Sequence, residues 1–234
     1  MSRNVIEICS WAGKVRALGG DKMDSIDQSR ERIIIVGDPR AAAVGILFVA
    51  VVLLGLQFTQ AIPATSVFLI LPMLFFGGAV QIVSGVMATA KGDNVIGMLF
   101  MVFGGFLMSF SVMVFGLTHA WWDVAPGSIP HAEAAFLMGW TILLTAWLLL
   151  SITMPLIFTL LLLAIDIALW ALVIGIWNSS EGPQKLAGYF LLVSAVGAIY
   201  IFAGYWLEWW AGRSILPHGR ALVQPPSGSS RVGH

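Results

Sequence analysis

The chain has 234 residues, of which 59% are hydrophobic and only 10% are charged. Soluble domains carry about 25% charged residues, so this chain has too few to cover its surface in water, and its mean hydropathy is +0.91. Its 12 Lys and Arg balance its 12 Asp and Glu, which excludes a basic surface for nucleic acid. The single cysteine, Cys9, excludes an internal disulfide and a metal site with several Cys ligands. The composition indicates an integral membrane protein.

Six apolar runs are long enough to cross a bilayer as helices. They cover residues 41–62, 66–90, 95–120, 134–153, 155–177 and 186–207. An uninterrupted stretch such as residues 160–163, all Leu, lacks the alternation of a transmembrane β-strand. We therefore predict an all-α, polytopic membrane protein whose six transmembrane helices form one bundle.

The two flanking segments differ from the apolar region. Residues 1–40 mix acidic and basic side chains and contain no apolar segment with the cleavage site of a signal peptide. Residues 208–234 contain Pro225, Pro226 and Gly228, a composition typical of disorder. The predicted organisation is an N-terminal tail (1–40), a transmembrane domain (41–207) and a disordered C-terminal tail (208–234).

Lys and Arg are distributed unequally between the two ends of the predicted bundle. All but Lys185 lie in the two tails or in the loop after the second run. These residues are Arg3, Lys14, Arg16, Lys22, Arg30, Arg32, Arg40, Lys91, Arg213, Arg220 and Arg231. Because positive charge is retained on the cytoplasmic side, we predict a multi-pass cell membrane protein with both termini in the cytoplasm.

No pattern in the sequence indicates catalysis or a cofactor, since it has no nucleophile elbow, phosphate-binding loop or HExxH motif. His119 and His131 flank the loop after the third run, together with Asp123 and Glu133. Two His and two acids can bind a metal, but this spacing matches no standard ligand pattern. We interpret these side chains as solvated.

Two polar residues interrupt the apolar runs. Asp166 lies near the middle of the fifth run, where an ionised acid costs at least about 2.5 kcal/mol, and no Lys or Arg lies at that depth. We expect it to be protonated. It either faces a pore, where it binds a proton or the substrate, or donates a hydrogen bond to a neighbouring helix. Gln81 in the second run is likewise either a bond between helices or a pore-lining group.

Small residues recur along the runs and predict close approach of the helices. They are Gly77, Gly78, Ser84, Gly85, Gly104, Gly105, Gly197 and Gly204. Pro72 interrupts the second run and predicts a kink that frees carbonyl groups.

Several segments, taken in order, carry a family resemblance. Residues 77–85 read Gly-Gly-Ala-Val-Gln-Ile-Val-Ser-Gly, and residues 103–109 read Phe-Gly-Gly-Phe-Leu-Met-Ser. Gly139-Trp140 and Thr145 follow in the fourth run, and residues 188–190, Gly-Tyr-Phe, precede Tyr200 in the last. In this order and spacing, they resemble the second, third, fourth and last spans of the acetate uptake transporter family, the succinate–acetate permeases.

The chain departs from that family in four of its spans. The family begins its first span with Asn-Pro-Ala-Pro-Leu-Gly-Leu, whereas residues 38–44 here read Asp-Pro-Arg-Ala-Ala-Ala-Val. Ala88, Phe103, Leu107 and Ile201 stand where the family has Glu, Tyr, Trp and Asn. These changes make the interior less polar and indicate a divergent member.

The resemblance implies a homohexamer of six-helix protomers, each with its own pore for acetate, succinate or similar small carboxylates, with or without a proton. It also implies a fold similar to that of the acid-gated urea channels. By position it implies a pathway formed by Asp38, Pro39, Gln81, Phe103, Phe106 and Tyr200, with Asp166 as a further candidate. Phe103 and Phe106 are either an apolar constriction or packing in the bundle core.

Three functions remain open from the sequence. The first is a carboxylate channel or proton-coupled transporter. The second, favoured by the scarcity of cations in the runs, is a pore for a neutral small solute such as urea, ammonia or an undissociated acid. The third is a non-transporting accessory or structural subunit, consistent with the altered residues 38–44.

Overall fold

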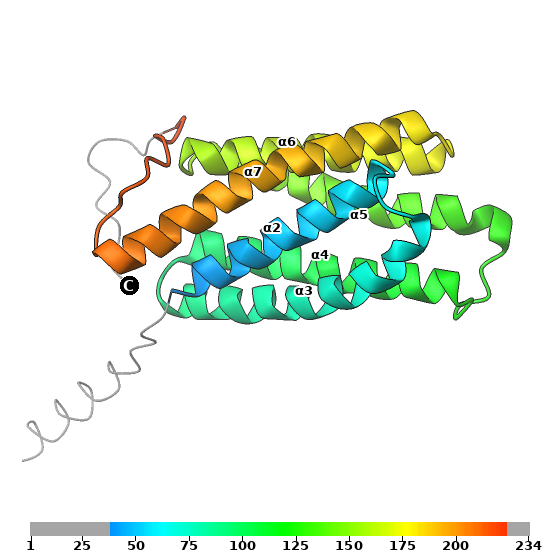
Figure 1. Cartoon of the computed structure of the whole chain (residues 1–234), viewed down its shortest axis with the longest axis horizontal. Coiled ribbons are helices and arrows are strands. Elements are labelled where there is room, and N and C mark those ends of the chain that lie inside the picture. Colours follow the sequence, from blue (N-terminus) through cyan, green and yellow to red (C-terminus); the bar gives the residue numbers. More distant parts are fainter. Residues whose placement is uncertain (1–37, 224–234) are drawn as a thin grey trace, which may run out of the picture. The chain divides into compact units, whose positions relative to one another are not determined.

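The computed structural model of the protein describes residues 38–223, and Figure 1 shows this part as a bundle of long helices. The helices are α2 (Pro39–Phe58), α3 (Val67–Ala90), α4 (Asn94–Thr118), α5 (Ile129–Ser151), α6 (Leu156–Trp177) and α7 (Glu181–Ala211), with short 3₁₀ turns at Ala64–Ser66 and Pro126–Ser128. Within residues 38–223, all six are long and apolar enough to cross a membrane. The predicted all-helical, six-span fold is confirmed.

The ends of two helices differ from the apolar runs. Helix α5 begins at Ile129 rather than residue 134, with Pro130 in its first turn, a position where proline fits a helix because that N–H has no helical partner. Helix α7 extends from Glu181 to Ala211 and ends at Gly212, whose φ of +66° is the left-handed conformation common after helices. A hydropathy pattern therefore underestimates the length of a helix whose last turns extend beyond the apolar layer of the membrane.

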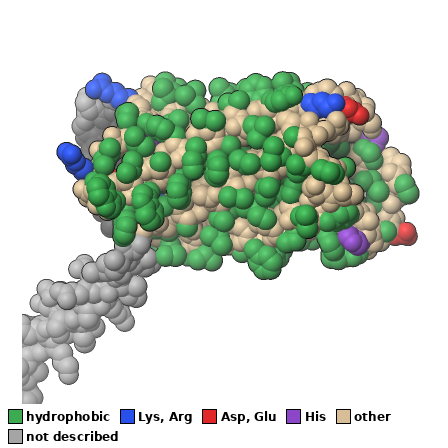
Figure 2. Space-filling model, viewed as in Figure 1, with side chains coloured by type: hydrophobic (Ala, Val, Ile, Leu, Met, Phe, Trp, Pro, Cys, Tyr) green, Lys and Arg blue, Asp and Glu red, His purple; other side chains and the backbone are tan. Residues whose placement is uncertain are grey.

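Figure 2 shows apolar side chains over most of the visible face of the bundle, with charged and His side chains near its two ends. Exposed apolar residues include Leu69 and Phe76 on α3 and Val196 on α7. In water such a surface would aggregate, whereas a bilayer covers it at no cost. The six helices therefore form a multi-pass membrane protein.

Helices α3 and α4 form the most closely packed pair. Gly78 faces Gly104, and Gly85 faces Gly97, so that a Cβ on any of these four would lie 2.5–2.7 Å from the carbonyl oxygen of its partner. Here the predicted close approach is confirmed. Pro72 lies inside α3, and the hydroxyl of Ser111 on α4 donates to the carbonyl oxygen of Leu71 at 2.7 Å.

The other helices are joined around a ring, with α2 between α3 and α7, α6 between α7 and α5, and only a slight contact between α5 and α4. The start of α2, the turn between α3 and α4, and the end of α7 lie at one end of the bundle (Figure 1). We call this the Asp38 end. The connections α2–α3, α4–α5 and α6–α7 lie at the opposite end.

Residues 212–223, which we call the terminal strap, pack against the start of α6 and the last part of α7. The Ile157 amide donates to the carbonyl oxygen of His218 at 3.2 Å, the Val223 amide to that of Ile152 at 3.0 Å, and the Tyr200 hydroxyl to that of Pro217 at 2.8 Å. The predicted disordered tail began at residue 208, whereas α7 reaches Ala211 and the strap is held by these bonds. The first backbone amides of a helix have no hydrogen-bond partner within the helix. The carbonyl oxygen of His218 accepts from one of these amides at the start of α6, and this bond helps to fix the strap.

Candidate functional site

A small cavity lies at the centre of the bundle, with a volume of about 30 Å³. Its lining comes from α2, α4, α5, α6 and α7, and every lining side chain is apolar. They are Leu47, Ala50, Val51, Leu54, Phe58, Phe103, Phe106, Leu107, Phe110, Leu137, Ile165, Leu169, Leu172 and Leu191. Helix α3 contributes none of them, although it packs against both α2 and α4.

Phe103 and Phe106 both line this cavity, from the face of α4 that also carries Leu107 and Phe110. These residues recur at the three- and four-residue spacing of one helix face. The ring of Phe106 lies 5.7 Å from the rings of Phe110 and Trp140. Phe103 and Phe106 therefore pack in the bundle core and also border the central space, and their role as a constriction in a pathway stays a prediction.

The size and chemistry of the cavity make it a closed apolar constriction. A volume of this kind holds about two water molecules, and a water needs two or more polar partners. The lining side chains offer none. In channels, apolar constrictions that stay dry exclude hydrated ions.

At the Asp38 end, Arg40 joins three parts of the chain. Its guanidinium forms a two-contact ion pair with Asp38 (Nε–Oδ1 3.0 Å and Nη2–Oδ2 2.8 Å) and a longer one with Asp93 (Nη1–Oδ2 3.6 Å). It also lies 4.4 Å from the centre of the Tyr205 ring, a cation–π distance. We call Asp38, Arg40, Asp93 and Tyr205 the Arg40 cluster. It ties α2 to the turn before α4 and to α7.

Asp38 also caps α2, because its carboxylate accepts from the Arg40 backbone amide at 2.9 Å, and Pro39 is buried in the first turn. Partial burial by itself would raise the pKa of Asp38. The hydrogen bonds from Arg40 and the positive charges of Arg40 and Lys91 outweigh that effect, so the pKa lies below its ordinary value. Asp38 is thus ionised at neutral pH and balances the charge of Arg40.

Gln81 and Tyr200 lie outside the lining of the central cavity. Gln81 is fully buried between α3 and α2, where its Nε2 donates to the carbonyl oxygen of Ala43 at 3.1 Å. Its Oε1 has no hydrogen-bond partner among residues 38–223. Tyr200 points to the terminal strap instead. The structure brings only Phe103 and Phe106 together at the cavity, with Asp38 and Pro39 at one end of the bundle.

Asp166 lies between α5 and α6 and is also absent from the cavity lining. Only 8% of it is exposed, and it accepts a hydrogen bond from the Thr145 hydroxyl at 2.6 Å. Thr145 in turn accepts from the Trp170 indole at 3.1 Å. These contacts favour the structural alternative, in which Asp166 bonds one helix to its neighbour.

The loop histidines lie against aromatic rings. The ring of His119 stacks on Phe115 at 4.0 Å, and the edge of His131 meets Trp177 at 5.0 Å. Within residues 38–223, no group of three or more His, Cys, Asp or Glu side chains is placed to hold a metal ion.

Sequence reasoning missed the longer-range members of the Arg40 cluster. Arg40 itself departs from the family pattern in residues 38–44, and that departure was the available signal. Asp93 and Tyr205 are far from Arg40 along the chain, so no local spacing connects them.

Comparison with known proteins agrees with this architecture. Residues 32–209 match the model of the GPR1/FUN34/yaaH family. No curated protein sequence matches the chain significantly. Among solved structures, the bacterial acetate channel SatP has the same fold, with a TM-score of 0.69 and 20% sequence identity over 77% of this chain and 98% of the channel's chain.

Proposed function

The chain belongs to the GPR1/FUN34/yaaH family, and from this premise we propose that it is a membrane channel or proton-coupled transporter for acetate and similar small carboxylates. The observation that carries the proposal is a closed apolar constriction at the centre of a fold shared with a bacterial acetate channel. A pathway that is dry and narrow holds back ions and large solutes while admitting a small molecule with an apolar end.

The chemistry of the constriction favours a neutral form of the solute at that point. A carboxylate anion would lose its hydration there and find no hydrogen-bond donor or cation among the lining side chains. The undissociated acid, or a carboxylate that moves together with a proton, avoids most of this cost. The same property makes a pore for another neutral solute, such as urea or ammonia, the second candidate function.

Passage requires the constriction to widen. The cavity has room for only about two waters, whereas acetate has four non-hydrogen atoms. Phe103 and Phe106 can widen the space by changing rotamer, which moves ring edges without breaking any hydrogen bond. Ion pairs of the Arg40 cluster then lie at one end of this path.

We further propose that the protein assembles as a homohexamer in the cell membrane with both termini in the cytoplasm. The assembly is implied by the family resemblance, and the orientation by the distribution of Lys and Arg. Cysteine introduced at Ser128 is expected to react with an impermeant reagent in sealed cells, and cysteine at Gly228 is not. Native mass spectrometry in mild detergent tests the hexamer.

Uptake into liposomes tests the transport function. Liposomes with the protein are expected to take up labelled acetate faster than empty liposomes, and Phe106→Trp, which fills the constriction, is expected to slow uptake severalfold. Phe76→Trp is the matched control, because Phe76 is 69% exposed on α3 and lines no part of the cavity. Both variants are first checked for a monodisperse peak in size exclusion.

Each other outcome has a defined meaning. Uptake of urea without acetate would replace the proposal with the neutral-solute pore. No uptake of acetate, succinate or urea by the wild-type protein would overturn both candidates in favour of the non-transporting subunit. Equal slowing by Phe106→Trp and Phe76→Trp would show that the transport pathway does not run through the central cavity.

A further inference from the structure

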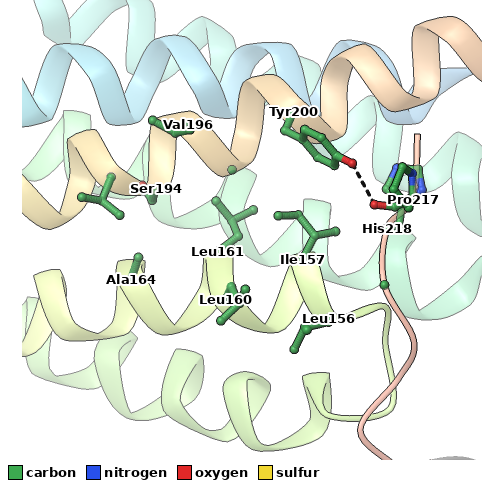
Figure 3. Close-up of a pocket in the computed structure, with 13 residues that line it drawn as sticks. Leu156, Ile157, Leu160, Leu161, Ala164, Ser194, Val196, Tyr200, Pro217 and His218 are labelled. Carbon is green, nitrogen blue, oxygen red and sulfur yellow. Dashed lines mark hydrogen bonds between the residues drawn. The ribbon is translucent and has the colours of Figure 1, made fainter. Parts of the chain in front are cut away.

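A second cavity, of about 560 Å³, opens on the side of the bundle between α6, α7 and the terminal strap. Figure 3 shows side chains of both helices bordering this space, with Pro217 and His218 at one end. We call it the lateral groove. It shares no lining residue with the central cavity, so the proposed transport pathway does not account for it.

The walls of the lateral groove are suited to a hydrocarbon chain. Leu156, Leu160 and Ala164 line it from α6, and nine residues of helix span about 12 Å along the helix axis. The two hydroxyl groups in the lining, of Ser194 and Tyr200, are already bonded to backbone carbonyl oxygens. An occupant therefore finds apolar contact along the groove and few free polar groups.

At the strap end of the groove, a glycine packs against α6 and basic residues lie nearby in the sequence, in contrast to the apolar walls. Gly219 has a φ of +78°, and a Cβ there would lie 2.9 Å from Cβ of Leu156, so glycine lets the strap lie directly against α6. Arg220 follows Gly219 directly, and Arg213 is the second residue of the strap. Both are exposed, and neither forms a salt bridge with any residue in the range 38–223. Arg40, by contrast, is balanced by two carboxylates.

From this arrangement we infer that the lateral groove binds an anionic phospholipid. One acyl chain lies along α6 and α7, and the phosphate group lies at the terminal strap beside Arg213 and Arg220. Basic side chains next to a groove between membrane helices recognise anionic head groups in this way. A second copy of the chain would also cover apolar surface, but it would leave the two arginines without the anion that a lipid supplies.

The head-group part of the inference is tested by native mass spectrometry of the intact protein in mild detergent with equal amounts of dioleoyl phosphatidylglycerol and dioleoyl phosphatidylcholine. The expected result is about one retained lipid per chain and a preference for phosphatidylglycerol. Arg213→Ala with Arg220→Ala is expected to reduce that preference by about fivefold or more, since one basic residue near the surface contributes about 1 kcal/mol. Lys185→Ala, at the opposite end of the bundle, is the control and should leave the preference unchanged.

The acyl-chain part is tested by filling the groove. Gly197 lines it, and a Cβ there would lie 3.4 Å from Cδ1 of Leu161, so Gly197→Leu extends a side chain across the space toward α6. Gly139→Leu is the matched control, because Gly139 lies in α5 with no atom within 4 Å of a Cβ. The Gly197→Leu protein is expected to retain at least fivefold less lipid per chain than the wild type, and the Gly139→Leu protein to retain as much as the wild type.

Three results would overturn the inference. One is equal lipid retention by the two Leu variants, and a second is an unchanged head-group preference after both arginines are replaced. The third is a wild-type protein that retains no lipid while Gly197→Leu lowers the number of subunits in the assembly, which would assign the groove to a second copy of the chain.

Discussion

Replacing Gly104 with Ala tests the close approach of α3 and α4. A Cβ at Gly104 would lie 2.5 Å from the carbonyl oxygen of Gly78 and 3.0 Å from the backbone nitrogen of Ile82. Both are backbone atoms, so the contact is relieved only if one helix shifts. Over-packing of this kind costs about 1–3 kcal/mol, whereas the gain in helix propensity from Gly to Ala is at most about 1 kcal/mol. Subtracting that gain leaves an expected net loss of up to about 2 kcal/mol in the free energy of unfolding.

The adjacent Gly105→Ala is the matched control, because a Cβ at Gly105 has only Cη2 of Trp140 nearby, at an ordinary contact distance of 3.5 Å. It is expected to be neutral or to stabilise the protein by up to about 1 kcal/mol. Titration of the detergent-solubilised protein with sodium dodecyl sulfate, followed by far-UV circular dichroism, measures both changes. Equal stability of the two variants, or a Gly104→Ala protein more stable than the wild type, would refute the packing argument.

Two further residues give sharp expectations. Asp38→Asn keeps an oxygen to cap α2 but removes the ion pair with Arg40, so the free energy of unfolding should fall by less than about 1 kcal/mol at neutral pH. Because the pKa of Asp38 is lowered in the folded protein, this contribution is present above 3.8 and is lost as the pH falls through the lowered pKa; a difference that persists in strong acid contradicts this. Asp166→Asn keeps a partner for Thr145 and should be silent in unfolding and acetate uptake, whereas Asp166→Leu removes the bond and should cost about 0.6–1.7 kcal/mol. An Asp166→Asn protein of unchanged stability whose uptake no longer depends on pH would instead assign Asp166 to proton transfer.

The six helices were predictable because the bilayer imposes both a length and an apolar composition on each span. The ends of α5 and α7 were not, since backbone hydrogen bonds continue a helix into the head-group region where polar side chains are tolerated. His131 and Glu133 therefore lie inside α5, and Glu208 lies inside α7, although each interrupts the apolar pattern. A hydropathy run measures the apolar layer rather than the helix.

The candidate site was predictable only in part, for a related reason. In a soluble protein, the apolar face of a helix identifies its interior, but these helices are apolar all round because lipid replaces water outside. The sequence therefore could not say which side of α3 or α7 faces the centre, and Gln81 and Tyr200 lie elsewhere. Phe103 and Phe106 were found through the family resemblance. Asp93 reaches Arg40 only through the turn between α3 and α4.

At the Asp38 end, one side chain links the Arg40 cluster to the terminal strap. Tyr205 is buried, carries the guanidinium of Arg40 on its ring, and lies 6.1 Å from the ring of His218 in the terminal strap. Gly204 provides the space for His218, because a Cβ there would lie 3.0 Å or less from two atoms of its imidazole. The strap that borders the lateral groove therefore packs on the same residue that holds Arg40 over the start of α2. This shared contact helps to hold the strap against the bundle, since it adds to the packing of the end at which the ion pairs join α2, α4 and α7.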